Sequence, residues 1–96
     1  MASDKAELRL NYTYEPENDC YTGVSACLTE DKHGKHPAEY ALTRPTMLRF
    51  FFSAIRDIYD ADVVSVCVAG GDPHFISPRT VREIRAGLLQ PEDFDI

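Results

Sequence analysis

Hydrophobic positions change their spacing along the chain, and this spacing predicts the order of the elements. Residues 7–14 alternate strictly, with leucine or tyrosine at every even position, which is typical of a half-buried β-strand. Residues 21–29 alternate in the same way, with Val24, Ala26 and Leu28 on the inward side. A shorter third strand is expected at 38–43, so the first part of the chain predicts an antiparallel meander.

The densest apolar sequence follows, and it predicts a helix over Pro45–Tyr59 with Thr43 or Arg44 as its cap. Its apolar side chains cover an arc of about 200°, roughly twice the stripe of an ordinary surface helix. One flank is expected on the sheet: Met47, Phe50, Phe51, Ala54 and Ile58. The other flank needs the second helix or another molecule as its neighbour: Leu48, Phe52, Ile55 and Tyr59.

The remaining part of the chain predicts one more strand and one more helix. Val63–Val68 is rich in β-branched residues, and Ser77-Pro78 is a helix start followed by a buried stripe at Val81, Ile84 and Leu88. The predicted fold is α+β, a two-layer sandwich in the order β-β-β-α-β-α. It has a mostly antiparallel four-stranded sheet and two helices on one face. We expect a single globular domain over 1–96 that ends in an acidic tail at 91–96.

The composition limits the class of function. The net charge is −6, which argues against sequence-independent nucleic-acid binding, because such proteins need a basic surface to displace counterions. The chain starts with polar residues and has no apolar run long enough to cross a membrane. Its three cysteines are an odd number and are expected to be reduced thiols. These features predict a cytoplasmic protein without a membrane partner.

Two groups of residues could carry chemistry, and neither has a recognisable spacing. Cys20, Cys27, His33 and His36 are potential zinc ligands, but six residues separate the cysteines instead of the usual two to four. We therefore expect no metal and no cofactor.

The loop from Gly70 to Ser77 is the second group. Asp72 and His74 could form an acid–base pair beside Cys67, yet no catalytic signature surrounds them. An enzyme is not the expected function.

Charged and aromatic clusters predict protein contacts instead. Acidic residues gather in the turn after the first strand and in the tail, and three arginines follow each other at i, i+3 and i+6 on the second helix. Arg49 and Arg56 of the first helix would extend this patch if the helices lie side by side. The residues expected to bind a partner are Glu15, Glu17, Asp19, Phe52, Tyr59, Arg79, Arg82, Arg85, Asp93 and Phe94.

These observations predict a small acidic, non-enzymatic protein-binding domain. It would occlude or bridge a larger nucleic-acid-handling complex that has a basic surface, without touching nucleic acid itself. In size, acidity and lack of motifs the chain resembles the broad class of small phage-encoded inhibitors, anti-CRISPR proteins among them. Two alternatives stay open: a small enzyme or ligand-binding domain that uses the Gly70–Ser77 loop, and a subunit of a homo-oligomer such as a homodimer.

Overall fold

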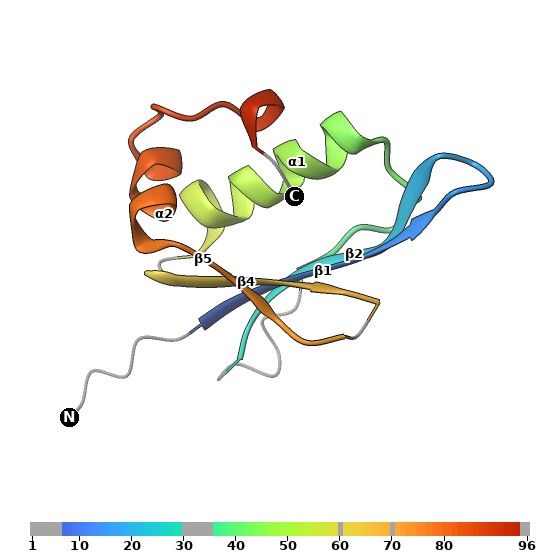
Figure 1. The fold of residues 1–96 in the computed structure, drawn as a ribbon, viewed down its shortest axis with the longest axis horizontal. Coiled ribbons are helices and arrows are strands. Elements are labelled where there is room, and N and C mark those ends of the chain that lie inside the picture. The colour runs from blue at the N-terminus through green and yellow to red at the C-terminus, as the bar shows by residue number, and fades with distance from the viewer. Residues whose placement is uncertain (1–6, 30–35, 60, 70, 95–96) are drawn as a thin grey trace.

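The computed structural model describes residues 7–29, 36–59, 61–69 and 71–94, which form an α+β fold (Figure 1). The elements are β1 (Glu7–Glu15), β2 (Cys20–Leu28), β3 (His36–Pro37), α1 (Arg44–Ser53), η1 (Ala54–Ile58), β4 (Val63–Val68), β5 (His74–Ile76), α2 (Pro78–Arg85) and η2 (Pro91–Asp93). Both α-helices lie on the same face of the sheet, as the sequence predicts (Figure 1). No helix among the described residues is long and apolar enough to cross a membrane.

The sheet has five strands in the order β3-β2-β1-β4-β5. β1 runs parallel to β4, whereas the other neighbouring strands are antiparallel. The predicted α+β fold is therefore confirmed, but the sheet is mixed and has five strands, where a mostly antiparallel sheet of four was expected. The reason is that α1 carries the chain across the sheet, so that β4 joins the free edge of β1 in the same direction.

The third strand also differs from the prediction. It is only His36–Pro37, which pairs with Ser25 and Ala26 of β2. Within the predicted span of 38–43, Leu42 alone forms a β-bridge, to Tyr21, with N–O distances of 2.8 Å in both directions. The fifth strand, β5, has three residues, too few to give a period in the sequence.

The hydrophobic core lies between the sheet and the helices. The even positions of β1 that the alternation predicts, Leu8 and Leu10, are fully buried. Their core neighbours in the sheet are Val24, Ala26, Val64 and Val66, and those in the helices are Met47, Leu48, Phe51, Phe52, Ala54, Ile55, Val81 and Ile84. The inward faces of β1 and β2 are thus confirmed.

The first helix begins where its sequence signals it. The Thr43 hydroxyl accepts a hydrogen bond from the Thr46 amide, and Pro45 occupies the first turn. Its last turn, η1, is a π-helix in which the Tyr59 amide donates to the Ala54 carbonyl at 3.0 Å. The wider turn rotates Ile58 away from the sheet and leaves it 47% exposed, so the expected sheet contact of Ile58 is wrong.

The second apolar flank of this helix is covered by the same chain. Phe52 is 1% exposed, and its ring lies 5.3 Å from the ring of Phe94 in an edge-on arrangement. At the other end of the flank, the Arg85 guanidinium donates to the backbone oxygens of Ile55 and Tyr59 at 3.2 and 3.1 Å. The C-terminal segment and α2 together cover this flank.

The second helix follows its predicted start but not its predicted end. The Ser77 hydroxyl caps it by accepting from the Thr80 amide, and Val81 and Ile84 are buried. Leu88, which was expected in the same stripe, is 78% exposed. The cause is Gly87, whose left-handed φ of 77° ends the helix before Leu88 can join the stripe.

The contact of Phe94 with Phe52 predicts a measurable coupling. In urea denaturation, Phe52→Ala should lower the free energy of unfolding by about 3–5 kcal/mol. Phe94→Ala should cost about 1–2 kcal/mol, because its ring is half-buried. The loss in the double variant should be about 0.5–1.5 kcal/mol smaller than the sum of the two single losses. Each single variant removes the contact between the two rings, whereas the double variant removes it only once. Leu88→Ala is the control and should change the value by less than about 0.5 kcal/mol. Strict additivity would show that the tail does not stabilise α1.

Candidate protein-binding site

The acidic turn that the sequence singles out lies at the tip of the β1–β2 hairpin. This hairpin, blue in Figure 1, extends beyond the start of α1. Glu17 and Asp19 are exposed at its tip and Glu15 is half-buried beside them. Asp19 has a left-handed φ of 49°, which aspartate tolerates better than most residues. The structure therefore brings the three predicted carboxylates together on one projecting element.

A β-bulge sets the twist of this hairpin. Asn11 pairs with Ser25, whereas Thr13 pairs with Thr22, so β2 has one extra residue between these pairs. Gly23 stands in the bulge with a φ of 59°, which a side chain would disfavour. Strict alternation from the core residues of β2 would turn Tyr21 away from the helices. The bulge turns it back to their side, where it is buried.

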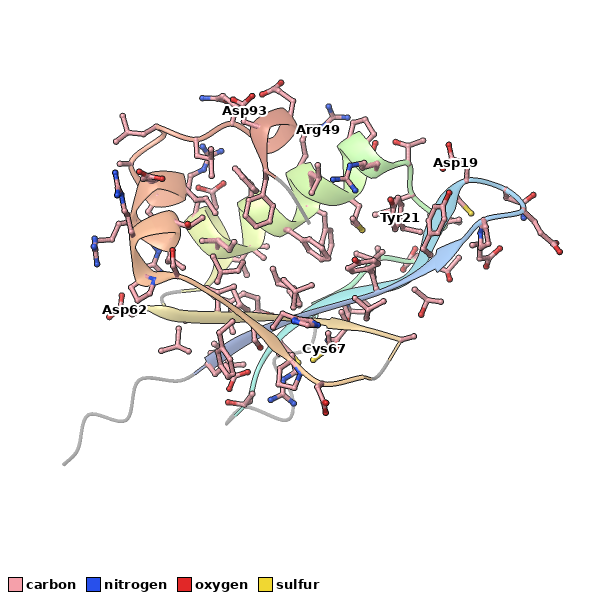
Figure 2. The ribbon with its side chains drawn as sticks, viewed as in Figure 1. Asp19, Tyr21, Arg49, Asp62, Cys67 and Asp93 are labelled. Carbon is pink, nitrogen blue, oxygen red and sulfur yellow. The ribbon has the colours of Figure 1, made fainter. Side chains whose placement is uncertain are left out.

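Aromatic rings connect the hairpin to the core. The ring of Tyr14 lies 5.0 Å from that of Tyr21, and Tyr21 lies 5.5 Å from Tyr12. Tyr12 in turn lies 6.3 Å from Phe51 of α1, which is fully buried. Figure 2 shows Tyr21 between the helix layer and the hairpin tip, where Asp19 is labelled. Such ring pairs contribute about 0.5–1.5 kcal/mol each beyond their burial, so the hairpin is anchored to the core at its base.

Hydrogen bonds order the acidic tip itself. The Tyr14 hydroxyl donates to Asp19 Oδ1 at 2.8 Å, and the side-chain amide of Asn18 donates to Glu15 Oε1 at 3.4 Å. The bond to Asp19 raises the pKa of Tyr14, because a phenolate there would face the carboxylate charge. Burial raises the pKa of Tyr12. Both phenols therefore stay protonated at neutral pH, and Tyr14 remains a donor to the tip.

The three arginines of α2 do not act as one patch. Arg79 forms an ion pair with Glu83 at 3.4 Å, and Arg82 is exposed. Arg85 turns inward to the backbone oxygens at the end of η1 and also donates to Asp62 at 3.5 Å. The side chain of Arg85 thus connects the two helices, which spacing alone did not reveal.

The predicted aromatic contacts lie mostly inside the fold. Phe52 is buried, and Phe94 packs on it from the tail. Tyr59 is half-buried, with its hydroxyl donating to the Ala26 carbonyl at 3.3 Å. Asp93 is exposed beside them (Figure 2). Of this group, Asp93 presents its side chain to solvent.

The residues expected to carry the alternative chemistry of the Gly70–Ser77 loop lie apart from one another. Cys67 is buried on the side of the sheet away from the helices (Figure 2), whereas His74 pairs with Val66 and shares its helix-facing side. The Ser77 hydroxyl is engaged in capping α2. A cavity of about 520 Å³ lies here, but its lining is mainly apolar, with Val66, Val68, Phe75 and Phe94 among its residues. Gly70 lies outside the described residues.

The possible zinc ligands are not assembled among the residues that the structure describes. No group of three or more His, Cys, Asp or Glu side chains in this part of the chain could hold a metal ion. Cys20 and Cys27 are half-buried free thiols. His33 lies outside the described residues, so the structure does not test the full set.

Two features of the hairpin region escaped the sequence analysis. Tyr12 and Tyr14 were assigned to one face of the first strand, and Tyr21 was assigned to neither face of the second. The ring contacts of these tyrosines depend on the bulge at Gly23, which is defined by the pairing of the two strands. Arg44, considered only as a helix cap, reaches the base of the hairpin and donates to the Tyr21 hydroxyl at 3.4 Å. The tyrosines at three positions around one predicted turn are the signal that could have indicated an aromatic cluster.

Comparisons of the chain with protein-family models, with curated proteins and with solved structures found no match.

The bond between Tyr14 and Asp19 gives a prediction for titration. We expect Tyr14 to titrate above the usual tyrosine value of 10, and Asp19→Asn to lower its pKa toward that value. The folded state holds this proton more tightly than the unfolded chain. The stabilisation of the folded state by this hydrogen bond is therefore present below about pH 10 and is lost as the pH rises further.

NMR of ring-labelled tyrosine resolves this titration residue by residue. Glu17→Gln is the control, because it removes a neighbouring charge without touching the hydrogen bond. An unchanged Tyr14 pKa in Asp19→Asn would show that the bond does not form in solution.

Proposed function

We propose that this protein is a non-enzymatic protein-binding domain that docks its acidic hairpin onto a basic surface of a larger partner. One observation carries the proposal: Glu15, Glu17 and Asp19 stand at the tip of a hairpin whose base is anchored to the core by three tyrosines. The carboxylates are thus displayed away from the body of the protein in an ordered arrangement.

Order at the tip matters for affinity. A binding segment that is already held in its bound form loses less conformational entropy when it meets its partner. The hydrogen bonds from Tyr14 and Asn18 restrict the carboxylates of Asp19 and Glu15 before binding. Clustered charge also speeds the encounter with a surface of opposite sign. The hairpin meets both conditions.

The expected partner is a protein whose surface is basic because it handles nucleic acid. Such surfaces carry Lys and Arg that contact phosphates, and a row of carboxylates presents them with a comparable pattern of negative charge. The net charge of −6 supports attraction to such a surface. Within this class, the size and acidity of the chain fit an inhibitor of the anti-CRISPR type, which would occlude or bridge its target.

Charge reversal at the tip tests the proposal. The variant Glu15→Lys, Glu17→Lys, Asp19→Lys should bind the partner at least about tenfold more weakly, the equivalent of three ion pairs of about 0.5 kcal/mol each. The partner is first captured from a lysate of the source cell or its host and identified by mass spectrometry. The purified partner is then titrated by calorimetry at two salt concentrations, and the salt dependence of binding should weaken in the variant.

A matched variant separates a local effect from the effect of net charge. Glu39→Lys, Asp57→Lys, Asp72→Lys changes three exposed acids outside the hairpin by the same total charge. It should retain most of the affinity. Equal affinity of the hairpin variant and the unaltered protein would refute the role of the tip, as would equal losses in both variants.

A further inference from the structure

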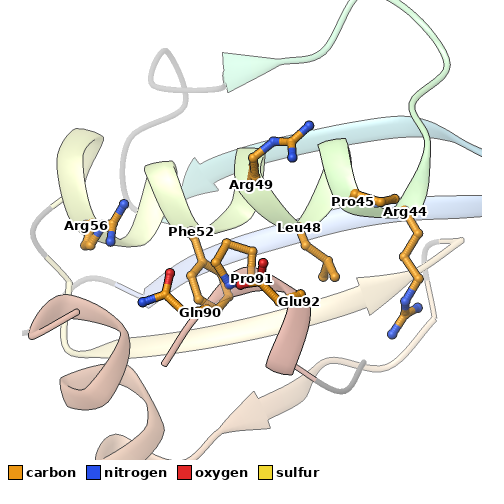
Figure 3. A pocket seen from close by; sticks show the side chains of 9 residues that line it. All are labelled: Arg44, Pro45, Leu48, Arg49, Phe52, Arg56, Gln90, Pro91 and Glu92. Atoms are coloured by element: carbon orange, nitrogen blue, oxygen red, sulfur yellow. The ribbon is translucent and has the colours of Figure 1, made fainter. Parts of the chain in front are cut away.

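A second charged surface runs along α1, on the helix layer. It is a groove of about 530 Å³ between this helix and the C-terminal segment, shown in Figure 3. Arg44, Arg49 and Arg56 line it from the helix, while Gln90, Pro91 and Glu92 line the opposite side. The hairpin carries acids, so this protein presents opposite charges at two separate places.

The groove has a regular layout because it follows the helix period. Arg44, Leu48, Phe52 and Arg56 succeed one another at i+4 spacing and share one stripe, with two apolar residues between two arginines. Arg49 stands on the adjacent row, and its side chain points away from those of Leu48 and Phe52 in Figure 3. A helix of this length separates the two terminal arginines by roughly 18 Å along its axis.

These arginines form no ion pair within the part of the chain that the structure describes, although Glu92 lines the same groove. The ion pairs in this part of the chain join Glu7 with Arg9, Glu83 with Arg79 and Asp62 with Arg85, and all of them lie away from the groove. The Arg49 guanidinium donates to the Thr46 hydroxyl at 3.3 Å, and that of Arg44 donates to the Tyr21 hydroxyl at 3.4 Å. Arg49 and Arg56 are exposed, so their guanidinium groups remain accessible to a ligand.

The chain itself shows which kind of segment this helix accepts. Its own residues 91–94 include two acids and a phenylalanine, and Phe94 packs edge-on against Phe52 at 5.3 Å. The acid Glu92 lies at the wall of the same groove. An acidic segment with an apolar anchor is therefore already compatible with this face of α1.

We propose that the groove binds an extended acidic segment of a protein partner. Guanidinium groups form two-pronged hydrogen bonds with carboxylates. Leu48 and Phe52 are buried, but the lining residues Pro45 and Pro91 keep accessible apolar surface, which favours a hydrophobic side chain. An extended chain covers about 3.4 Å per residue, so a span of roughly 18 Å corresponds to about five residues. The segment should thus carry two carboxylates about five residues apart with an apolar residue between them.

A protein segment fits these observations better than nucleic acid does. A phosphate backbone would meet the arginines but would leave the accessible apolar surface of Pro45 and Pro91 without a matching group. The net charge of −6 also repels a long polyanion, whereas a short acidic peptide adds little to that repulsion. This inference does not depend on the proposed role of the hairpin.

A defined peptide tests the groove directly. The probe is a fluorescein-labelled peptide of about ten residues, with two glutamates five residues apart and a leucine midway between them. Its binding is followed by fluorescence anisotropy, and by chemical-shift changes in ¹⁵N-labelled full-length protein. We expect saturable binding with shifts at Arg44, Arg49 and Arg56, the three arginines that line the groove. The same peptide with lysines in place of the glutamates should not bind.

Paired arginine variants show where the peptide binds. Arg49→Glu, Arg56→Glu should weaken binding at least tenfold, because the glutamates that replace the two guanidinium groups repel the carboxylates of the peptide. Arg79→Glu, Arg82→Glu is the matched control, since it changes two exposed arginines of α2 by the same charge, and it should stay within twofold. The lysine variant of the hairpin tip should also keep its affinity for the peptide, so failure of one surface is distinguishable from failure of the other.

Three results would overturn the proposal. The first is no saturable binding of the glutamate peptide, and the second is an equal loss in both arginine pairs. The third is displacement of the peptide by a short oligothymidylate at lower concentration than by unlabelled peptide, which would identify the groove as a phosphate site.

Discussion

Both proposed binding surfaces depend on two adjacent phenylalanines of α1 that point to different sides of the helix. Phe51 faces the sheet and lies against Tyr12, whereas Phe52 faces outward along the helix layer and lies against Phe94. Both rings are almost completely buried. The apolar arc of α1, wider than one neighbour can cover, is what allows one helix to organise two surfaces.

The face of α1 that carries Phe51 is connected to the hairpin. Its ring begins a series that passes through Tyr12 and Tyr21 to Tyr14, and Tyr14 donates to Asp19 at the acidic tip. The side of Phe52 leads to the groove, because the tail segment that covers this ring also forms the far wall. Among the described residues, the ion pairs do not join the hairpin acids to the arginines of the groove. This separation lets a chain of net charge −6 offer a basic groove as well as an acidic hairpin.

Local signals in the sequence predicted the features that local interactions determine. The alternation at Leu8 and Leu10, the caps at Thr43 and Ser77 and the acidic turn all concern residues close together in the chain, and the structure contains them. Their physical basis is the fixed period of strands and the unpaired amides at helix starts.

The features that were missed depend on partners far away in the chain. The parallel pairing of β1 with β4 joins residues more than fifty positions apart, and nothing within either strand reports its neighbour. The same holds for the inward turn of Arg85 and for the cover that Phe94 provides to Phe52. The bulge at Gly23 and the π-turn before Tyr59 each shift the period by about one residue. A regular pattern of positions is therefore valid only up to such a shift. The π-turn is the reason why a regular helical pattern places Ile58 wrongly on the sheet.

We propose that the hairpin is an ordered extension of the core that meets the partner. Amide hydrogen exchange of the full chain, free and bound to the captured partner, tests it most directly. We expect amides in residues 14–22 to be protected already in the free protein and to become further protected in the complex. Rapid exchange of these amides in the free protein would contradict it. So would protection confined to the sheet face away from the helices, around Arg9 and Phe75, when the partner is bound.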